Sequence, residues 1–186
     1  MSDTSRLLDD VGNRVAGAEE RLFAHVYDEL LALARGKMAR EAARADLNPS
    51  DIVGEAFLKL CGREAAWENR RHFFGAAARA MHQVLVDQAR ARNAAKRGGG
   101  QAALPLDDRD GAVAPASHTD TLDIALALVE LEQADPRAAR VVRLRVYAGL
   151  TLPEIAQDLG VSERTVSNDW AFARAWLFDR LKSTNE

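Results

Sequence analysis

The sequence has few of the residues on which several common protein classes depend. Cys61 is the only cysteine among 186 residues, so an internal disulfide framework and a zinc site built from several cysteines are excluded. No apolar run approaches the roughly 20 residues that a helix needs to cross a bilayer. The polar, acid-rich start has no apolar signal core. We therefore expect a soluble, reduced, cytoplasmic protein without a membrane segment.

Side chains that could build a catalytic or metal site are scattered. The four histidines, His25, His72, His82 and His118, are dispersed along the chain, and no two of them have the i, i+4 spacing of helical metal ligands. The glycine run at residues 98–100 does not follow a strand, so it does not resemble a phosphate-binding loop. We therefore expect no enzymatic activity, no metal ion and no cofactor.

Net charge is near balance overall but uneven along the chain. The full sequence carries 25 Lys and Arg against 28 Asp and Glu, a formal net charge of −3. Residues 1–62 have a net charge of −3, residues 63–97 of +5, and residues 98–186 of −5. A basic segment of this kind is a candidate footprint for nucleic-acid phosphates. Charge alone is equally consistent with a solvated basic helix face.

Hydrophobic spacing predicts helices and no strands. Apolar residues recur at helical intervals within residues 22–33, 52–60 and 73–85, and again after residue 118. Residues 96–118 contain three consecutive glycines, two prolines and three aspartates, a composition typical of a flexible linker. The expected fold is all-α, with two small helical domains at residues 1–95 and 119–186 joined by that linker.

The strongest local pattern lies in residues 150–177. Thr151 and Glu154 have the spacing of a capping box at the start of one helix, and Gly160 is expected to end that helix in the left-handed conformation. Ser162 is then placed to cap a second helix. Two helices joined by a tight, glycine-containing turn are typical of a helix-turn-helix. An ordinary helical hairpin is the alternative.

In a helix-turn-helix, the first turns of the second helix enter the DNA major groove. Arginine can pair bidentately with guanine and asparagine with adenine, so Arg164 and Asn168 are the strongest candidates for base contacts. Each could instead contact a phosphate or remain a solvated surface residue. The residues expected at this DNA-facing surface are Ser162, Glu163, Arg164, Thr165, Ser167 and Asn168.

A different surface is predicted on the helix that begins at Asn48 and Pro49. Opposite its apolar stripe lie Asp51, Glu55 and Lys59. Acidic side chains do not attract DNA, so this face suits a protein partner or solvent.

Together these features resemble a bacterial RNA polymerase sigma factor of the extracytoplasmic-function (ECF) type, in the sigma-70 family. The resemblance covers nearly the whole chain. It rests on LLDD at 7–10, RLFAHVYDELLALA at 21–34, LNPSDIVGEAFLKL at 47–60, WENRRHFFGAAARAMHQVLVDQARARNAAKRGGG at 67–100 and DPRAARVVRLRVYAGLTLPEIAQDLGVSERTVSNDWAFARAWL at 135–177.

The resemblance implies a transcription initiation factor that binds core RNA polymerase and directs it to promoter DNA. The second helix would contact the clamp helices of the largest subunit through Asp51, Glu55, Phe57 and Leu58, although Phe57 also belongs to the apolar stripe. The C-terminal helix-turn-helix would read the minus-thirty-five element and touch the polymerase flap. An anti-sigma factor is a further candidate partner, and the free chain is expected to be a monomer.

The third helix would read and open the minus-ten element. The residues that the resemblance places there are Arg70, Arg71, His72, Arg79, His82, Gln83, Arg90, Arg92, Lys96 and Arg97. The sequence departs from the wider family at Arg79-Ala80, where many members have an Arg-Asn pair, so the residues of a flipped-base pocket are not carried over. Two other functions stay open: a stand-alone helix-turn-helix transcriptional regulator, which would usually dimerise, and a protein-interaction scaffold.

Overall fold

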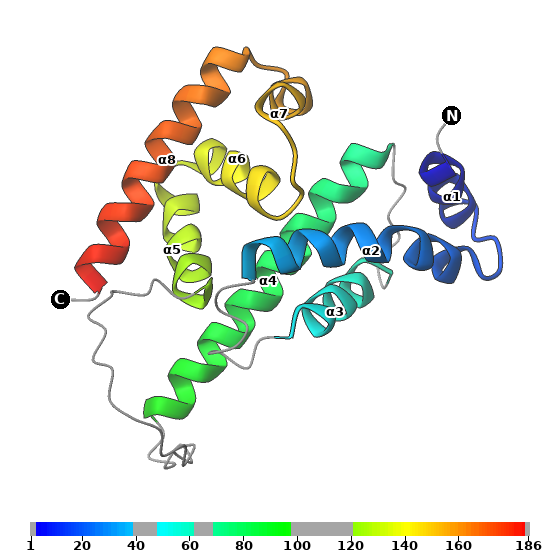
Figure 1. The fold of residues 1–186 in the computed structure, drawn as a ribbon, viewed down its shortest axis with the longest axis horizontal. Coiled ribbons are helices and arrows are strands. Elements are labelled where there is room, and N and C mark those ends of the chain that lie inside the picture. The colour runs from blue at the N-terminus through cyan, green and yellow to red at the C-terminus, as the bar shows by residue number, and fades with distance from the viewer. Residues whose placement is uncertain (1–2, 39–47, 62–68, 98–120, 185–186) are drawn as a thin grey trace.

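The computed structural model describes residues 3–38, 48–61, 69–97 and 121–184 (Figure 1). These residues form eight helices and no strand, which confirms the expected all-α fold. The predicted linker, residues 96–118, falls almost entirely outside the described residues, apart from its first two residues at the end of a helix. No helix among the described segments is both long enough and apolar enough to cross a membrane.

The chain order places four helices before residue 98 and four after residue 120. We refer to them as the N-terminal half and the C-terminal half. The helices are α1 (Asp3–Gly12), α2 (Ala18–Met38), α3 (Pro49–Cys61), α4 (Arg70–Arg97), α5 (Thr121–Ala134), α6 (Pro136–Val146), α7 (Leu152–Leu159) and α8 (Glu163–Thr184).

In the N-terminal half, the predicted apolar stripes face one another. Val26 of α2, Val53 of α3 and Val84 of α4 are each at most 1% exposed, and α3 packs against both α2 and α4. Helix α1 was not predicted from the sequence. It packs on α2 and buries Leu8, because a short amphipathic segment becomes a stable helix only when its apolar side finds a partner.

Local capping signals define the helices of the C-terminal half. The Asp135 carboxylate accepts a hydrogen bond of 2.9 Å from the backbone N–H of Ala138 at the start of α6. Gly149 follows α6 in the left-handed conformation, with φ of +68°. This glycine is also a point of close approach, because a Cβ atom there would clash with Leu33 of α2.

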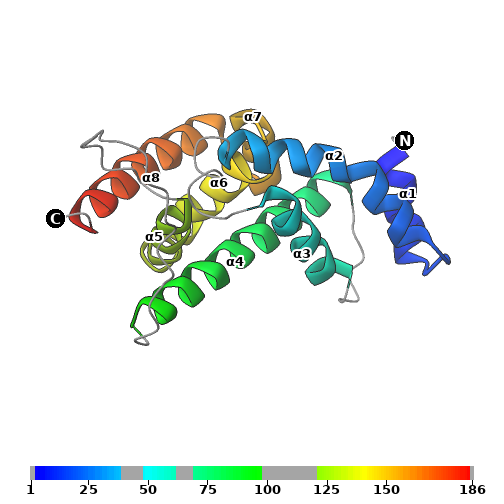
Figure 2. The same ribbon diagram turned by 60° about the horizontal axis from the view of Figure 1, so that its bottom comes forward.

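Helix α4 lies between the two halves. Both views show it running diagonally (Figures 1 and 2), and in Figure 1 α1 and α3 lie on one side of it and α5–α8 on the other, while α2 crosses it. It packs against α3 and also against α5 and α6. The buried apolar side chains of both halves form one continuous cluster. Helix α4, which was predicted as the third helix of the N-terminal domain, therefore also packs against the C-terminal half.

Candidate nucleic-acid interface

The predicted helix-turn-helix segment has the bounds and caps expected from its sequence. Thr151 and Glu154 form a reciprocal capping box at the start of α7, in which Thr151 N–H donates to the Glu154 carboxylate over 2.8 Å. These hydrogen bonds from Thr151 hold the pKa of Glu154 below its ordinary value. Gly160 ends α7 in the left-handed conformation, with φ of +65°. Local hydrogen bonds thus define both sides of the turn.

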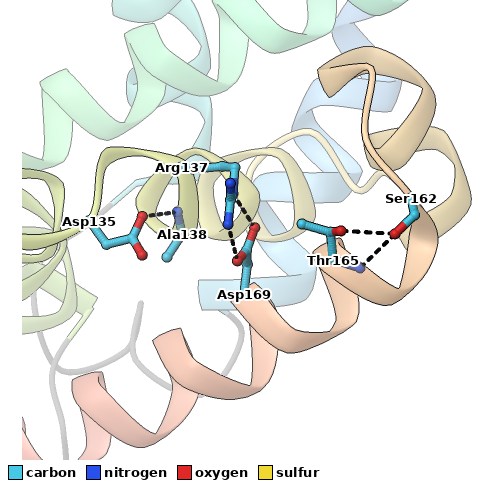
Figure 3. A network of polar contacts seen from close by, with 6 residues as sticks. All are labelled: Asp135, Arg137, Ala138, Ser162, Thr165 and Asp169. Carbon is cyan, nitrogen blue, oxygen red and sulfur yellow. Dashed lines mark hydrogen bonds and ion pairs between the residues drawn. The ribbon is translucent and has the colours of Figure 1, made fainter.

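The first turns of α8 present polar side chains to solvent. Ser162 accepts a 3.1 Å hydrogen bond from the N–H of Thr165, and their hydroxyls lie 2.8 Å apart (Figure 3). Arg164 and Asn168 are exposed, and within the described residues neither side chain is engaged by a hydrogen bond or ion pair. Their free donors and acceptors can therefore meet the edges of bases in a major groove.

An ion pair between α6 and α8 sets the orientation of this surface. Arg137 donates two hydrogen bonds to the Asp169 carboxylate, of 2.7 and 3.0 Å (Figure 3). Asp169 is only 7% exposed, and its carboxylate raises the pKa of Arg137 further above its ordinary value. A bidentate pair fixes direction as well as distance. Asp169 thereby anchors the helix whose outer face carries Arg164 and Asn168.

The ion pair between Asp169 and Arg137 was not predicted from the sequence. A signal was present, because Asp169 lies three residues after Val166 and four before Ala173, both of which are fully buried. A carboxylate at an apolar-face position requires a partner in the fold. The spacing could have predicted a buried ion pair, but not that Arg137 would supply it.

The predicted polymerase-binding surface lies on the outer side of α3. Asp51, Glu55 and Leu58 are exposed, and Leu58, at 73%, is the most exposed large apolar side chain of the described residues. Phe57 differs, since it is 8% exposed and its ring lies 4.4 Å from that of Phe23. The structure places Phe57 in the core, as its position in the apolar stripe indicates, and not on the surface that the resemblance assigned to it.

The side chain of Lys59 connects the outer side of α3 to α4. Lys59 lies 3.7 Å from the Glu55 carboxylate and donates a 2.8 Å hydrogen bond to Asp87. The hydrogen bond from Lys59 is the main reason why the pKa of Asp87 is lowered. Gln83 donates to the same carboxylate over 2.9 Å. Two predicted surfaces, on α3 and on α4, are therefore joined by one polar network.

Several of the predicted minus-ten residues on α4 are already engaged by other side chains. Arg70 pairs with Glu29 of α2 and lies over the Phe74 ring, while Arg71 donates a hydrogen bond to Gln157 of α7. Arg92 pairs with Asp123 of α5 at 3.1 Å. His72, Arg79 and Arg90 are exposed. The structure does not describe the side chains of Lys96 and Arg97 in the last turn of α4.

His82 occupies a different environment from the one that the resemblance implies. It is 5% exposed, and its Nε2 lies 3.0 Å from the backbone oxygen of Ala125 in α5. Its ring lies 5.8 Å from the ring of Tyr147 in α6. Burial lowers the pKa of His82, and the nearby Arg143 acts in the same direction. In this arrangement His82 faces the C-terminal half and does not face a nucleic-acid surface.

An open groove lies between α4 and the C-terminal half. Arg79 and Gln83 line it from α4, while Arg140, Arg143 and Asp158 line it from α6 and α7. Arg140 pairs with Asp158 at 3.0 Å, and Arg143 pairs with Glu132 at 2.9 Å. Among the described residues, nothing pairs with Arg79. The basic side of α4 is therefore partly enclosed.

Comparison with known protein families gives a match over nearly the whole chain. A family model described as ECF sigma factor matches residues 1–183. A search of curated proteins finds no match. The matched range includes the exposed turns of α8, the outer side of α3 and the basic helix α4, the three surfaces described above. The chain belongs to the ECF sigma factor family, and it is a sigma factor that acts in transcription initiation.

Proposed function

We propose that this sigma factor binds core RNA polymerase through α3 and reads the minus-thirty-five and minus-ten promoter elements through α8 and α4. The observation that carries this proposal is the start of α8. There Arg164 and Asn168 are exposed on a helix that is capped at Ser162 and anchored through Asp169. A rigid helix with free guanidinium and amide groups at its first turns suits direct readout in a major groove.

The outer side of α3 supports polymerase binding. An exposed leucine one helical turn beyond Glu55 provides an apolar anchor beside a polar rim, as protein interfaces usually have. The nearby acidic residues disfavour contact with DNA phosphates. Leu58, Asp51 and Glu55 are therefore the residues of α3 that we assign to the clamp helices of the largest subunit.

The distribution of charge explains why two DNA-reading helices need a polymerase. Neither half is strongly basic overall, so each helix alone supplies little non-specific affinity for phosphates. Binding to a common polymerase makes the second DNA contact intramolecular and raises its effective concentration. We therefore expect the isolated chain to bind promoter DNA weakly.

Run-off transcription with core polymerase over a library of promoter sequences tests the proposal. The chain should give start sites that are absent with core enzyme alone and that share two sequence elements. Size-exclusion chromatography of the same mixture should show a one-to-one complex. A free dimer that binds palindromic DNA without polymerase would refute the assignment in favour of a stand-alone regulator.

A further inference from the structure

We propose that an apolar cavity among the helices binds a small carboxylic acid, whose aliphatic tail of about six to eight carbons fills the cavity and whose head group pairs with Arg174. The cavity lies where α2, α3 and α4 meet α5, α6 and α8. It is lined by the inner sides of these helices, whereas the contacts that we assign to DNA and polymerase lie on outer sides. Binding of such an acid is therefore independent of the proposed function.

The cavity is larger than the gaps that ordinary helix packing leaves. Its volume is about 190 Å³, whereas the voids of a close-packed protein interior seldom exceed the size of one water molecule. An engineered apolar cavity of about 150 Å³ in another protein stays dry and binds benzene, which has six carbons. A slightly larger apolar space therefore suits an organic tail of about six to eight carbons better than it suits water.

The inner wall of the cavity is aliphatic and closed to solvent. Ile52 of α3 and Met81 and Leu85 of α4 line it, and each is at most 2% exposed. Val142 of α6 continues this wall and is 3% exposed. These side chains offer no hydrogen bond, so burying a polar group against them would cost free energy. The inner end therefore accepts the apolar part of a ligand.

The wall also carries two hydroxyl groups, from Thr121 and Tyr147. Both residues are 8% exposed. Burial raises the pKa of Tyr147, so its hydroxyl stays neutral at physiological pH. Among the described residues that line the cavity, Arg174 alone is charged. A ligand in this cavity therefore meets one positive charge and no negative one.

Arg174 stands at the open side of the cavity. It lies between Trp170 and Leu177 on the side of α8 that lines the cavity, and unlike these two half-buried neighbours it is exposed. Within the described residues, no carboxylate pairs with it. A guanidinium can donate two parallel hydrogen bonds to one carboxylate. An acid with its tail inside would therefore place its head group at Arg174.

The number and sign of charges select the head group. An amine on the same tail would be repelled by Arg174, and an alcohol would gain only the burial of its tail. A phosphate monoester carries up to about two negative charges near neutral pH, more than one arginine neutralises. A monocarboxylate matches the single positive charge and can keep its outer side in solvent.

Three probes with the same tail test the ligand class. Isothermal titration calorimetry on the full chain compares octanoate, octanol and octylamine. Octanoate should bind with one-to-one stoichiometry and about fivefold more tightly than octanol, the gain expected from one solvent-exposed ion pair. Octylamine should bind more weakly than octanol. Absence of saturable octanoate binding would overturn the site, and equal affinity for octanoate and octylamine would overturn the assigned head group.

Variants of Arg174 test where the head group lies. Arg174→Gln should weaken octanoate binding by about fivefold and leave octanol binding unchanged. Lys182→Gln is the matched control, because it removes another exposed positive charge from α8 and Lys182 contacts the Phe178 ring, outside the cavity lining. It should leave both affinities unchanged. Equal losses of octanoate affinity in the two variants would mean that the acid responds only to overall charge.

Variants of Ile124 test where the tail lies. Ile124 of α5 lines the cavity and is half-buried, so it can be enlarged with little disturbance of the core. Ile124→Trp should weaken binding of octanoate and octanol alike by about tenfold or more, because it fills the space. The control is Val129→Trp, a half-buried residue of α5 outside the described lining, which should bind as wild type.

A change of chain-length preference completes the test. Ile124→Ala enlarges the cavity and should move the tightest-binding acid from octanoate towards decanoate, a result that misfolding does not produce. An unchanged preference, together with wild-type binding by Ile124→Trp, would place the acid outside the cavity and overturn the proposal. All titrations omit polymerase and DNA. Failure of the ligand site and failure of the proposed function are therefore observed separately.

Discussion

The two helices that we assign to promoter DNA differ in how their polar side chains are held. On α8, Arg164 and Asn168 are exposed and, among the described residues, unengaged. On α4, Arg71 and Arg92 are bound by the C-terminal half and His82 is buried beneath it. One DNA-reading surface is therefore open in the free chain, whereas the other is only partly open, since His72, Arg79 and Arg90 are exposed beside the engaged side chains. The two helices therefore differ in how far neighbouring helices restrict their polar side chains.

Removing the base-reading side chains of α8 should have the largest effect. The double variant Arg164→Ala and Asn168→Ala should reduce minus-thirty-five discrimination by about 100-fold, since each bidentate base contact supplies about 1–3 kcal/mol. Competition between wild-type and scrambled minus-thirty-five promoters in run-off transcription measures it. Arg174→Ala is the control, an exposed arginine of α8 about 15 Å further along the helix from Arg164. Equal losses in both variants would contradict specific readout.

The open surface of α3 provides the second test. Leu58→Asp should weaken binding to core polymerase by about tenfold, because an exposed apolar anchor is replaced by a charge. The matched control is Val15→Asp, an apolar residue 44% exposed between α1 and α2. Fluorescence anisotropy with labelled chain and core enzyme gives both affinities. Unchanged affinity for Leu58→Asp would exclude this part of α3 from the polymerase interface.

Loss of an ion pair on α4 should have a milder effect. Asp123→Lys removes the partner of Arg92 and places a like charge beside it, which should lower the free energy of unfolding by about 1 kcal/mol. Arg164→Glu reverses a charge on the unengaged surface of α8 and should change that free energy by less than about 0.5 kcal/mol. Urea denaturation followed by circular dichroism measures both. Equal losses in the two variants would contradict the difference between α4 and α8.

Acidification should have the smallest effect, again a loss of stability. Burial depresses the pKa of His82 in the folded chain, and unfolding would return it towards its ordinary value of about 6.5. The unfolded chain therefore binds a proton first as pH falls below about 6.5, and the folded chain loses stability there. The groups facing His82 are Glu132 of α5 and Arg143 and Tyr147 of α6.

The pH prediction is measured by urea denaturation of the chain at a series of pH values. The free energy of unfolding should fall from about pH 7.5 to about pH 5.5. His82→Phe should reduce that dependence, whereas His25→Gln should keep it, because His25 contacts Thr4 within the N-terminal half. A dependence that is unchanged in His82→Phe would assign the effect to another group.

The elements that sequence predicted well are those defined by neighbours along the chain. The capping box of Thr151 and Glu154, the left-handed Gly160 and the cap at Ser162 depend on groups within three or four residues. Helix α1 was not predicted because its apolar side is short. The helix gains its stability from packing on α2. Asp169 was missed because the sequence does not reveal which cation will neutralise a buried carboxylate.

The sequence by itself determined an all-α chain, the positions of its caps, and the membership of a family whose members act in transcription initiation. These follow from local hydrogen bonds and from apolar spacing along single helices. Only the tertiary structure decided which side of α4 is covered. His82 meets the Ala125 carbonyl and the Tyr147 ring, which lie far along the sequence. Contacts of that range depend on how whole helices pack, which no local pattern of residues specifies.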